Sequence, residues 1–592
     1  MSYYCNPLNI SYKYQFNKNT NGELSVSREA ADPSMIMFKE RYYIFPSMTC
    51  GFLYSDDMAE WKFHPVKNLP SYEYAPDVRV VGDYVYFCAS SHDLPSFYRT
   101  KDLFSDNFEE IKSTFPFWDP NLFADDDGRI YLYWGSSPYL PMYGVELNPS
   151  DMTPIGEKKE LIIGNEKEIG FERSGENHIP PHSPEEVAEN LKSFDQDTEG
   201  MSEEMKNSAM AYIKNSPYIE GLWVNKHNGK YYLQYATPGS RYNIYADGVY
   251  VGDSPLGPFK LAKNNPYSYK PGGFIPGAGH GSTMEDYQGN IWHTATMRII
   301  MNHNFERRIG IWPAGWDNDG ELFCNQRYGD WPVNVEQAKL NPWANPEWML
   351  LSYGKAAKAS SCAIGSSTSN VTDENIQTWW KASSNRAGEW IEVDMGKEYD
   401  VRAIQINFAD DGLFLSLPDG AELNGTLHQE RWIDETLQPT RWKLEGSLDE
   451  ENYFIIEDKS DVETDLPHDL VVKENGIKAR YVKLTVFSLP YGQTACVSGI
   501  RVFGLGNGNA PTKAKGVKVD RVGDFDMDVS WEGNGTGYVV EWGHAPDKLY
   551  HSYQVFEQSV RIGGLIKGQD TYYVRVDSFN DNGITEGDVI KV

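Results

Sequence analysis

Five ionisable residues occupy matching points of a sequence pattern that recurs along the chain. Each stands at the start of a short apolar strand, which a turn joins to a second strand rich in aromatic residues. A lone Asp-Pro is usually a turn or a cap, but several carboxyl groups in one place can divide the work of general acid and general base. Burying so many ionisable groups is costly unless they serve a site. The five residues are Asp32, Asp77, Asp119, Glu220 and His280.

The pattern is clearest between residues 117 and 135. Asp119 precedes an apolar run there, and an Asp-Gly turn then leads into an alternating aromatic strand at 130–134. Asp-Gly between two such runs is a strong signal for a β-hairpin. Similar strand–turn–strand units begin near residues 31, 75, 218 and 279.

The spacing of these units predicts the fold class. The first three follow one another about every 40 to 50 residues, which is typical of propeller blades. We therefore predict an all-β chain with a five-bladed β-propeller at residues 1–340; the part of the chain that follows resembles two β-sandwich domains. The inner strand of each blade starts at the central axis, so the five ionisable residues should meet there. The first strand-like stretch, 9–16, is expected to pair with the last blade and close the ring.

An insertion at residues 156–215 separates the third and fourth units. Ser183 followed by a proline and two acids is a good helix start, and residues 201–213 predict a second helix. Two interpretations stay open: a solvated ornament, or a wall of the active-site mouth just before the strand that carries Glu220.

The combination of motifs resembles glycoside hydrolase family 43, a family of five-bladed propellers, over roughly residues 25 to 335. The matching motifs are Ala31-Asp32-Pro33, Ala75-Pro76-Asp77, Asp119-Pro120 with its hairpin, Glu220-Gly221 and Gly279-His280-Gly281-Ser282. The resemblance implies that Asp32 is the general base, Glu220 the general acid, and Asp119 a modulator that disfavours ionisation of that acid. The family often has a substrate-contacting arginine before a Trp…Asp-Gly strand. Spacing does not decide between Arg307 and Arg308, and the other one would be a surface charge.

Further substrate contacts are expected around these acids. Asp77 and His280 are candidates, and His280 alternatively holds a cation through water or is a core histidine bonded to backbone. No cofactor is required, although a structural or axial calcium ion is compatible with the fold. Four aromatic residues are candidates for packing on the sugar ring, with ordinary packing between blades as the alternative: Tyr74, Trp118, Phe52 and Trp223.

Two more domains follow the propeller. Residues 350–506 resemble a discoidin-type (coagulation factor C-type) β-sandwich through runs such as 378–384, 389–396 and 480–485. Its role is either sugar binding or buttressing of the propeller, and Phe414 and Trp432, from an extra loop, are expected to reach the active-site rim. Residues 510–592 resemble a fibronectin type III domain, to which we assign a spacer role.

Composition limits the partners. The net charge of −31 disfavours nucleic acid and anionic membrane as partners. No apolar run is long enough for a membrane span, and the start lacks the pattern of a signal peptide. A cytoplasmic protein is therefore expected, or a secreted one if a signal peptide was removed. The six cysteines lack metal-site spacing and are predicted to be mostly free thiols. The oligomeric state stays open.

The resemblance implies an inverting exo-glycosidase that releases terminal α-L-arabinofuranosyl or β-D-xylosyl units from plant cell-wall oligosaccharides or polysaccharides. An endo-acting arabinanase is the alternative within the same class. From another class, a non-catalytic carbohydrate-binding propeller is the alternative, although all three acids are present.

Overall fold

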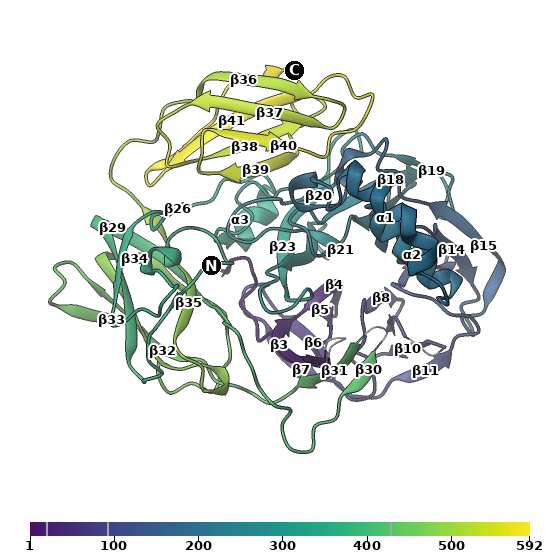
Figure 1. Cartoon of the computed structure of the whole chain (residues 1–592), viewed down its shortest axis with the longest axis horizontal. Coiled ribbons are helices and arrows are strands. Elements are labelled where there is room, and N and C mark those ends of the chain that lie inside the picture. Colours follow the sequence, from purple (N-terminus) through teal and green to yellow (C-terminus); the bar gives the residue numbers. More distant parts are fainter. Residues whose placement is uncertain (19–21, 92–93, 427–428) are drawn as a thin grey trace.

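The computed structural model describes residues 1–18, 22–91, 94–426 and 429–592. The first part of the chain forms five antiparallel sheets (Figure 1). Their innermost strands, β4, β8, β12, β16 and β21, contact one another in that order, and β21 contacts β4 again. This closed ring of five sheets is the predicted propeller.

The first three blades are meanders of consecutive strands. Alternating apolar residues bury the faces of each sheet between neighbouring blades. The strands are β4 (Ala31–Phe38), β5 (Arg41–Ser47), β6 (Gly51–Ser55), β7 (Lys62–Pro65), β8 (Asp77–Val81), β9 (Tyr84–Cys88), β10 (Ser96–Thr100), β11 (Glu109–Lys112), β12 (Asn121–Ala124), β13 (Ile130–Trp134), β14 (Met142–Leu147) and β15 (Pro154–Ile162).

The insertion and the last two blades follow. Helix α1 (Pro184–Asp197) begins with a capping box between Ser183 and Glu186, and α2 (Glu203–Ile213) follows it, which confirms both predicted helices. The strands are β16 (Glu220–His227), β17 (Lys230–Thr237), β18 (Ala246–Gly252), β19 (Phe259–Leu261), β20 (Ser268–Tyr269), β21 (Gly279–Glu285), β22 (Ile291–Arg298), β23 (Arg307–Trp316) and β24 (Leu322–Cys324).

The N-terminal strands do not close the ring as predicted. Strand β2 (Lys13–Lys18) pairs with β3 (Leu24–Glu29) on one side and with β31 (Gln429–Asp434), a strand of the second domain, on the other. Together with β30 (Asn424–Thr426) they form a separate four-stranded sheet. Its apolar residues Tyr14, Phe16 and Val26 pack against Trp432 and the loop before it. The prediction was wrong because the partner strand is supplied by another domain.

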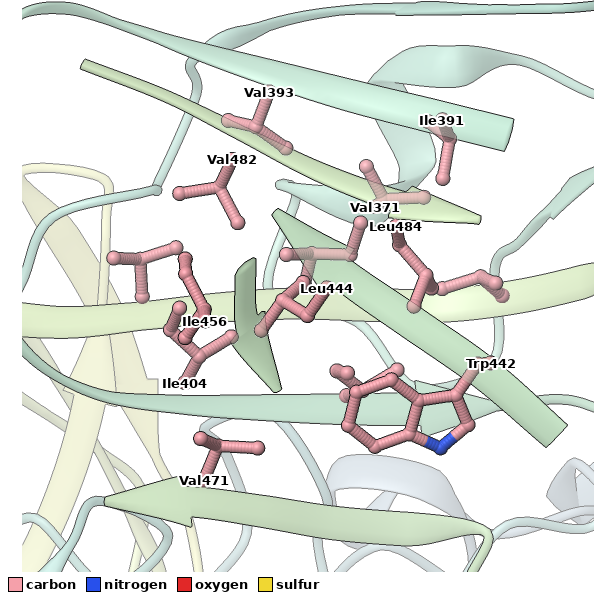
Figure 2. Close-up of a cluster of buried hydrophobic side chains, with 14 of the residues drawn as sticks. Val371, Ile391, Val393, Ile404, Trp442, Leu444, Ile456, Val471, Val482 and Leu484 are labelled. Atoms are coloured by element: carbon pink, nitrogen blue, oxygen red, sulfur yellow. The ribbon is translucent and has the colours of Figure 1, made fainter. Parts of the chain in front are cut away.

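The second domain is built on one eight-stranded sheet around its own core. Figure 2 shows this core, in which Trp442 lies among aliphatic side chains from several strands. Helix α3 (Val335–Leu340) leads from the propeller into this domain, and β1 (Tyr3–Tyr4) pairs with β25 (Val333–Asn334) next to it. The strands of the sheet are β26 (Met349–Leu350), β27 (Ala356–Ala359), β28 (Trp380–Lys381), β29 (Glu389–Phe408), β32 (Arg441–Ser447), β33 (Tyr453–Lys459), β34 (His468–Ser488) and β35 (Cys496–Leu505).

The C-terminal domain has two sheets around a shared core. Met527, Val529 and Trp531 meet Val540 and Val574 in this core, which continues into propeller residues such as Tyr269. The domain is therefore packed on the propeller and is more than a spacer; its likeness to fibronectin type III stays a prediction. Its strands are β36 (Lys515–Val522), β37 (Asp526–Glu532), β38 (Gly537–Gly543), β39 (His551–Val555), β40 (Ser559–Ile562), β41 (Tyr573–Asn580), β42 (Gly583–Thr585) and β43 (Ile590–Lys591).

All six cysteines lie in the described ranges and are free thiols. Among the residues that the structure describes, no helix is both long and apolar enough to cross a membrane.

Candidate active site

A cavity of about 400 Å³ lies where the inner strands of the propeller begin. Four of the five ionisable residues line it: Asp32 at the start of β4, Asp119 just before β12, Glu220 at the start of β16 and His280 in β21. Arg307, the first residue of β23, joins them. The structure thus brings together the three acids to which the family resemblance assigns catalytic roles.

A shared backbone geometry turns these side chains into the cavity. Asp32, Asp119 and His280 all have positive φ values, of 48°, 48° and 52°. A side chain of the preceding blade holds each backbone N–H: Thr296 Oγ1 accepts from Asp32 at 2.8 Å, and Ser90 Oγ from Asp119 at 2.9 Å. Such conformations are strained for residues with a Cβ, and the surrounding contacts stabilise them.

Asp77 does not belong to this set, so its prediction as a substrate contact was wrong. The residue that matches Asp32 in blade two is Ala75, which has a φ of 48° and donates its N–H to Ser47 Oγ. Asp77 lies two residues further on, where it accepts from Leu122 N at 2.7 Å and from Asn121 Nδ2 at 2.8 Å.

Side chains at the equivalent position link other blades in the same way. Ser34 Oγ accepts from the N–H of Val78, and Ser282 Oγ accepts from the N–H of Met35. Asp77 is therefore a link between blades two and three. Burial raises its pKa to about 6, against the opposing effect of Arg79.

Asp32 is equipped to stay ionised. Its carboxylate accepts from Ser47 Oγ at 2.7 Å and from Arg307 at 3.1 Å, and His280 Nδ1 lies 3.4 Å away. Burial alone would raise the pKa of Asp32, but Arg307, His280 and the hydroxyl donors outweigh it, and the pKa lies below its ordinary value. An ionised, oriented carboxylate suits a general base.

Asp119 has the opposite charge preference. Burial raises its pKa to about 7, and the negative charges of Glu220 and Asp32 act in the same direction, while His280 opposes them. The carboxyl group of Asp119 therefore retains a proton up to about neutral pH.

Glu220 is fixed on the cavity wall by two hydroxyl groups. Tyr245 donates to Oε1 at 2.7 Å and Ser136 to Oε2 at 3.0 Å. Gly221 leaves no room for a side chain, because a Cβ there would lie 2.6 Å from the His280 ring. Neither Tyr245 nor Ser136 carried a motif, so sequence reasoning missed them.

His280 lies in the cavity with its ring near Asp32. Burial alone would lower its pKa, but the charges of Asp32, Asp119 and Glu220 outweigh burial and raise it. In the described part of the chain, no three His, Cys, Asp or Glu side chains converge as metal ligands. A cation held by His280 through water stays a prediction.

The structure separates the two candidate arginines. Arg307 contacts Asp32 and Glu29, whereas Arg308 points away from the cavity and donates to His468 Nε2 of the second domain at 2.8 Å. Arg308 is buried, so the prediction of a surface charge was wrong for this residue. The reason is that another domain covers the outer face of β23.

Of the four aromatic candidates for substrate contact, two line the cavity and two are buried elsewhere. Tyr74 and Trp118 line the cavity, and Phe305 joins them from a loop that sequence reasoning missed. Phe52 is buried among aromatic residues of blades one and two. Trp223 is also buried, donates to the Thr283 carbonyl and carries Arg79 on its ring. The prediction that Phe52 and Trp223 contact substrate is therefore corrected.

The insertion forms one wall of the cavity. Tyr212 of α2 is 54% exposed and lies at its mouth, next to Tyr242 and Arg241. Other residues of the insertion also line it: Ser174, Pro181, Ser208 and Asn215. Of the two loop residues expected at the rim, Phe414 is 91% exposed and Trp432 packs on Phe16, and neither is among the lining residues.

Comparisons with known proteins cover the propeller and the second domain. The family model described as glycosyl hydrolases family 43 matches residues 25–322, and the model described as NedA-like, galactose-binding domain matches residues 370–484. A xylosidase/arabinosidase 43A of Humicola insolens is 26% identical over 49% of this chain and 95% of its own length. A beta-xylosidase of Xylanibacter ruminicola is 27% identical over 24% of this chain and 38% of its own length.

Solved structures are also similar. One is a thermostable family-43 glycoside hydrolase, 20% identical, with a TM-score of 0.40 over 58% of this chain and all of that one. The family model covers half of the chain, including all of the acids that line the cavity, and we conclude that the chain belongs to glycoside hydrolase family 43 and is a glycoside hydrolase.

Proposed function

We propose that this chain is an inverting exo-glycosidase that releases terminal α-L-arabinofuranosyl or β-D-xylosyl units from plant cell-wall oligosaccharides. The observation that carries the proposal is the opposed pair Asp32 and Glu220 in one walled cavity. They stand on blades one and four, which are not neighbours in the ring. The names of the relatives support this substrate class.

The geometry suggests the following reaction. Glu220 gives its proton to the glycosidic oxygen as the bond to the anomeric carbon breaks. Asp32 takes a proton from a water molecule, whose oxygen attacks the anomeric carbon from the opposite face and inverts it. Asp119 is the modulator of this acid that the family resemblance implies. Arg307 and Ser47 hold the base, and Tyr245 and Ser136 hold the acid.

The wall formed by the insertion favours exo action. It encloses the cavity beside Glu220, which suits a terminal sugar, whereas an endo-acting enzyme needs a cleft that is open at both ends. The endo-arabinanase alternative predicts oligomers as the first products from linear arabinan, and our proposal predicts monosaccharide.

A panel of aryl glycosides tests the proposal. We expect release from the α-L-arabinofuranoside, the β-D-xylopyranoside or both, and a loss of about 10² to 10⁴-fold in Glu220→Gln. Glu285→Gln is a matched control, because Glu285 is an exposed carboxylate on the far end of β21. Equal turnover by Glu220→Gln and the wild type would overturn the assignment of the acid. A wild type that is silent toward both pentosides would overturn the substrate class.

A further inference from the structure

A strand of the second domain reaches the edge of the active site. Strand β31 pairs with β2 in an antiparallel register that runs from Tyr14 opposite Asp434 to Lys18 opposite Glu430. The hairpin β30–β31 thereby joins the sheet in which β2 lies between β31 and β3, and β3 leads directly into Asp32 (Figure 1). A segment almost 400 residues from Asp32 in sequence is built into the neighbourhood of the base.

Arg431 is the residue that β31 directs toward the cavity. It is only 2% exposed, and it donates one hydrogen bond to Glu29 Oε2 at 2.8 Å and another to the hydroxyl group of Tyr74. Its guanidinium also lies 5.0 Å from the centre of the Tyr74 ring. Tyr74 lines the cavity, so Arg431 contacts the cavity wall from behind.

Glu29 connects Arg431 to the catalytic base. Its other carboxylate oxygen accepts from Arg307 Nε at 3.2 Å, and Arg307 in turn donates to Asp32 Oδ1 at 3.1 Å. Two buried carboxylates thus share two buried guanidinium groups in the order Arg431, Glu29, Arg307, Asp32. Removing one partner from such a network leaves an uncompensated buried charge.

Holding the two domains together does not by itself explain this arrangement. Other buried contacts join them: Arg28 bridges to Asp410 and Asp465, and Arg308 donates to His468. None of these three partners is among the residues that line the cavity, whereas Tyr74 and Arg307 are. The position of Arg431 therefore fits a role in the reaction.

We propose that Arg431 is a positioning residue for hydrolysis, by which the second domain orients Tyr74 in the cavity wall and, through Glu29, the Arg307–Asp32 pair. This inference rests on the proposed function for its substrate. It assigns to the second domain a part in building the active site.

The contacts of Arg431 with Glu29 and with Tyr74 have separate consequences. Without the positive charge of Arg431, Glu29 draws Arg307 away from Asp32 and adds negative potential there, so protonation of Asp32 becomes easier. Other charged or titratable groups face this network: His280, Asp119, Tyr74 and His303. Lysine would keep the charge but lose the fork that binds Glu29 and Tyr74 together.

The test measures kcat and KM across pH for Arg431→Gln, Arg431→Lys and Tyr74→Phe on the best glycoside of the wild type. We expect Arg431→Gln to lower kcat/KM at least tenfold, because losing one charge-assisted hydrogen bond costs about a factor of ten in rate. The acidic limb of the pH profile should move to higher pH, because Asp32 is then protonated more easily. Arg431→Lys should keep the acidic limb at the pH of the wild type but should not reach the kcat/KM of the wild type. Tyr74→Phe should raise KM without moving the limb.

Arg28→Lys is the matched control, since Arg28 is equally buried at the same interface and its partners Asp410 and Asp465 do not line the cavity. The proposal is overturned if Arg431→Gln, folded like the wild type, keeps the acidic limb unchanged. It is also overturned if Arg431→Lys loses no more activity than Arg28→Lys; this comparison decides the matter if Arg431→Gln does not fold. If the proposed substrate class is wrong, the wild type will prefer some other glycoside. The kcat/KM of each variant relative to the wild type is then measured on that glycoside.

Discussion

Neighbouring groups give the carboxyl groups of the cavity different charges. Asp32 has Arg307 and His280 beside it, and its pKa is lowered despite burial. Asp119 is equally buried but has Glu220 and Asp32 as negative neighbours, and its pKa is raised to about 7. The cavity therefore holds one ionised and one protonated carboxyl group, and glycoside hydrolysis uses one of each.

The pH dependence of the reaction follows from these two shifts. We expect kcat/KM to fall as the pH rises through about 7, because the carboxyl group of Asp119 then loses its proton. On the acidic side activity should persist to below about pH 4, since Asp32 stays ionised below its ordinary range. A profile from pH 3 to pH 9 on an aryl glycoside checks both limbs; a rate that is still rising at pH 9 would contradict the first.

Stability should also depend on Asp119. Its pKa is about 7 in the folded state and 3.8 ordinarily, so between these values the folded state binds a proton that the unfolded state releases. The contribution of Asp119 to stability is therefore lost as the pH rises from about 4 to 7. Asp119→Asn should be more stable than the wild type at pH 8, by about 1 to 3 kcal/mol, and nearly equal to it at pH 4.

Denaturant unfolding at the two pH values measures this difference. The same variant should lose activity, which would place Asp119 among residues that trade stability for function. Equal stability differences at pH 4 and pH 8 would show that ionisation of Asp119 is not the cause.

Asp77 should matter for stability and not for turnover. Asp77→Ala removes the acceptor of two buried donors, Leu122 N and Asn121 Nδ2, and we expect a loss of about 2 to 4 kcal/mol in the free energy of unfolding. Denaturant unfolding measures that loss, while kcat and KM should stay within about twofold of the wild type. A normally stable variant with impaired kcat would return Asp77 to the active site.

At the scale of elements, the insertion changes the shape of the cavity. Helix α2 presents Tyr212, which is more than half exposed, at the mouth of the cavity. The centre of its ring lies 5.6 Å from the guanidinium carbon of Arg241. Because its ring can pack on the sugar that follows the scissile bond, Tyr212→Ala should raise KM for oligosaccharides about three- to tenfold. The kcat should change little, since the lost contact is present in both the bound substrate and the transition state.

Comparison of substrates makes this prediction specific. An aryl glycoside of a single sugar should be affected less than a xylo- or arabino-oligosaccharide. Lys192→Ala on α1 is the control, because Lys192 is exposed and pairs with Glu189 of the same helix. An unchanged KM for oligosaccharides in Tyr212→Ala would favour the solvated-ornament interpretation for this helix.

At the scale of the whole molecule, both additional domains brace the propeller. The C-terminal domain holds the base of the insertion: Gly170 donates to the Leu565 carbonyl at 3.0 Å, and Arg173 pairs with Asp526. Ser174, the next residue, lines the cavity. The position of this wall therefore depends on a domain more than 300 residues away in sequence.

Loosening this brace should change substrate binding at a distance. We expect Asp526→Ala to raise KM and to speed amide hydrogen exchange at residues 168–178, because the Arg173 guanidinium loses its partner. Asp528→Ala is the matched control, since Asp528 lies on the same strand but pairs with the exposed Arg561 within its own domain. The same effect in both variants would mean that the whole domain, and not this contact, is perturbed.

The sequence by itself determined the features that repeat or are local. The period of the aromatic strands indicated a propeller, the Ser-Pro start indicated a helix, and the Asp-Pro motifs located Asp32 and Asp119. These signals are readable because turn geometry and alternation of apolar residues depend on near neighbours. The register within blade two was not readable, because Ala75 and Asp77 differ by two residues and only the backbone conformation shows which one faces the axis.

Only the tertiary structure decided which residues from distant segments meet. Arg431 lies behind Tyr74 because β31 pairs with β2, and Arg308 is buried because the second domain covers it. Tyr245 and Ser136 hold Glu220 without any motif of their own. Such contacts join segments that are distant in sequence. They form only when packing of the domains buries the charged groups side by side, where each requires an oppositely charged partner.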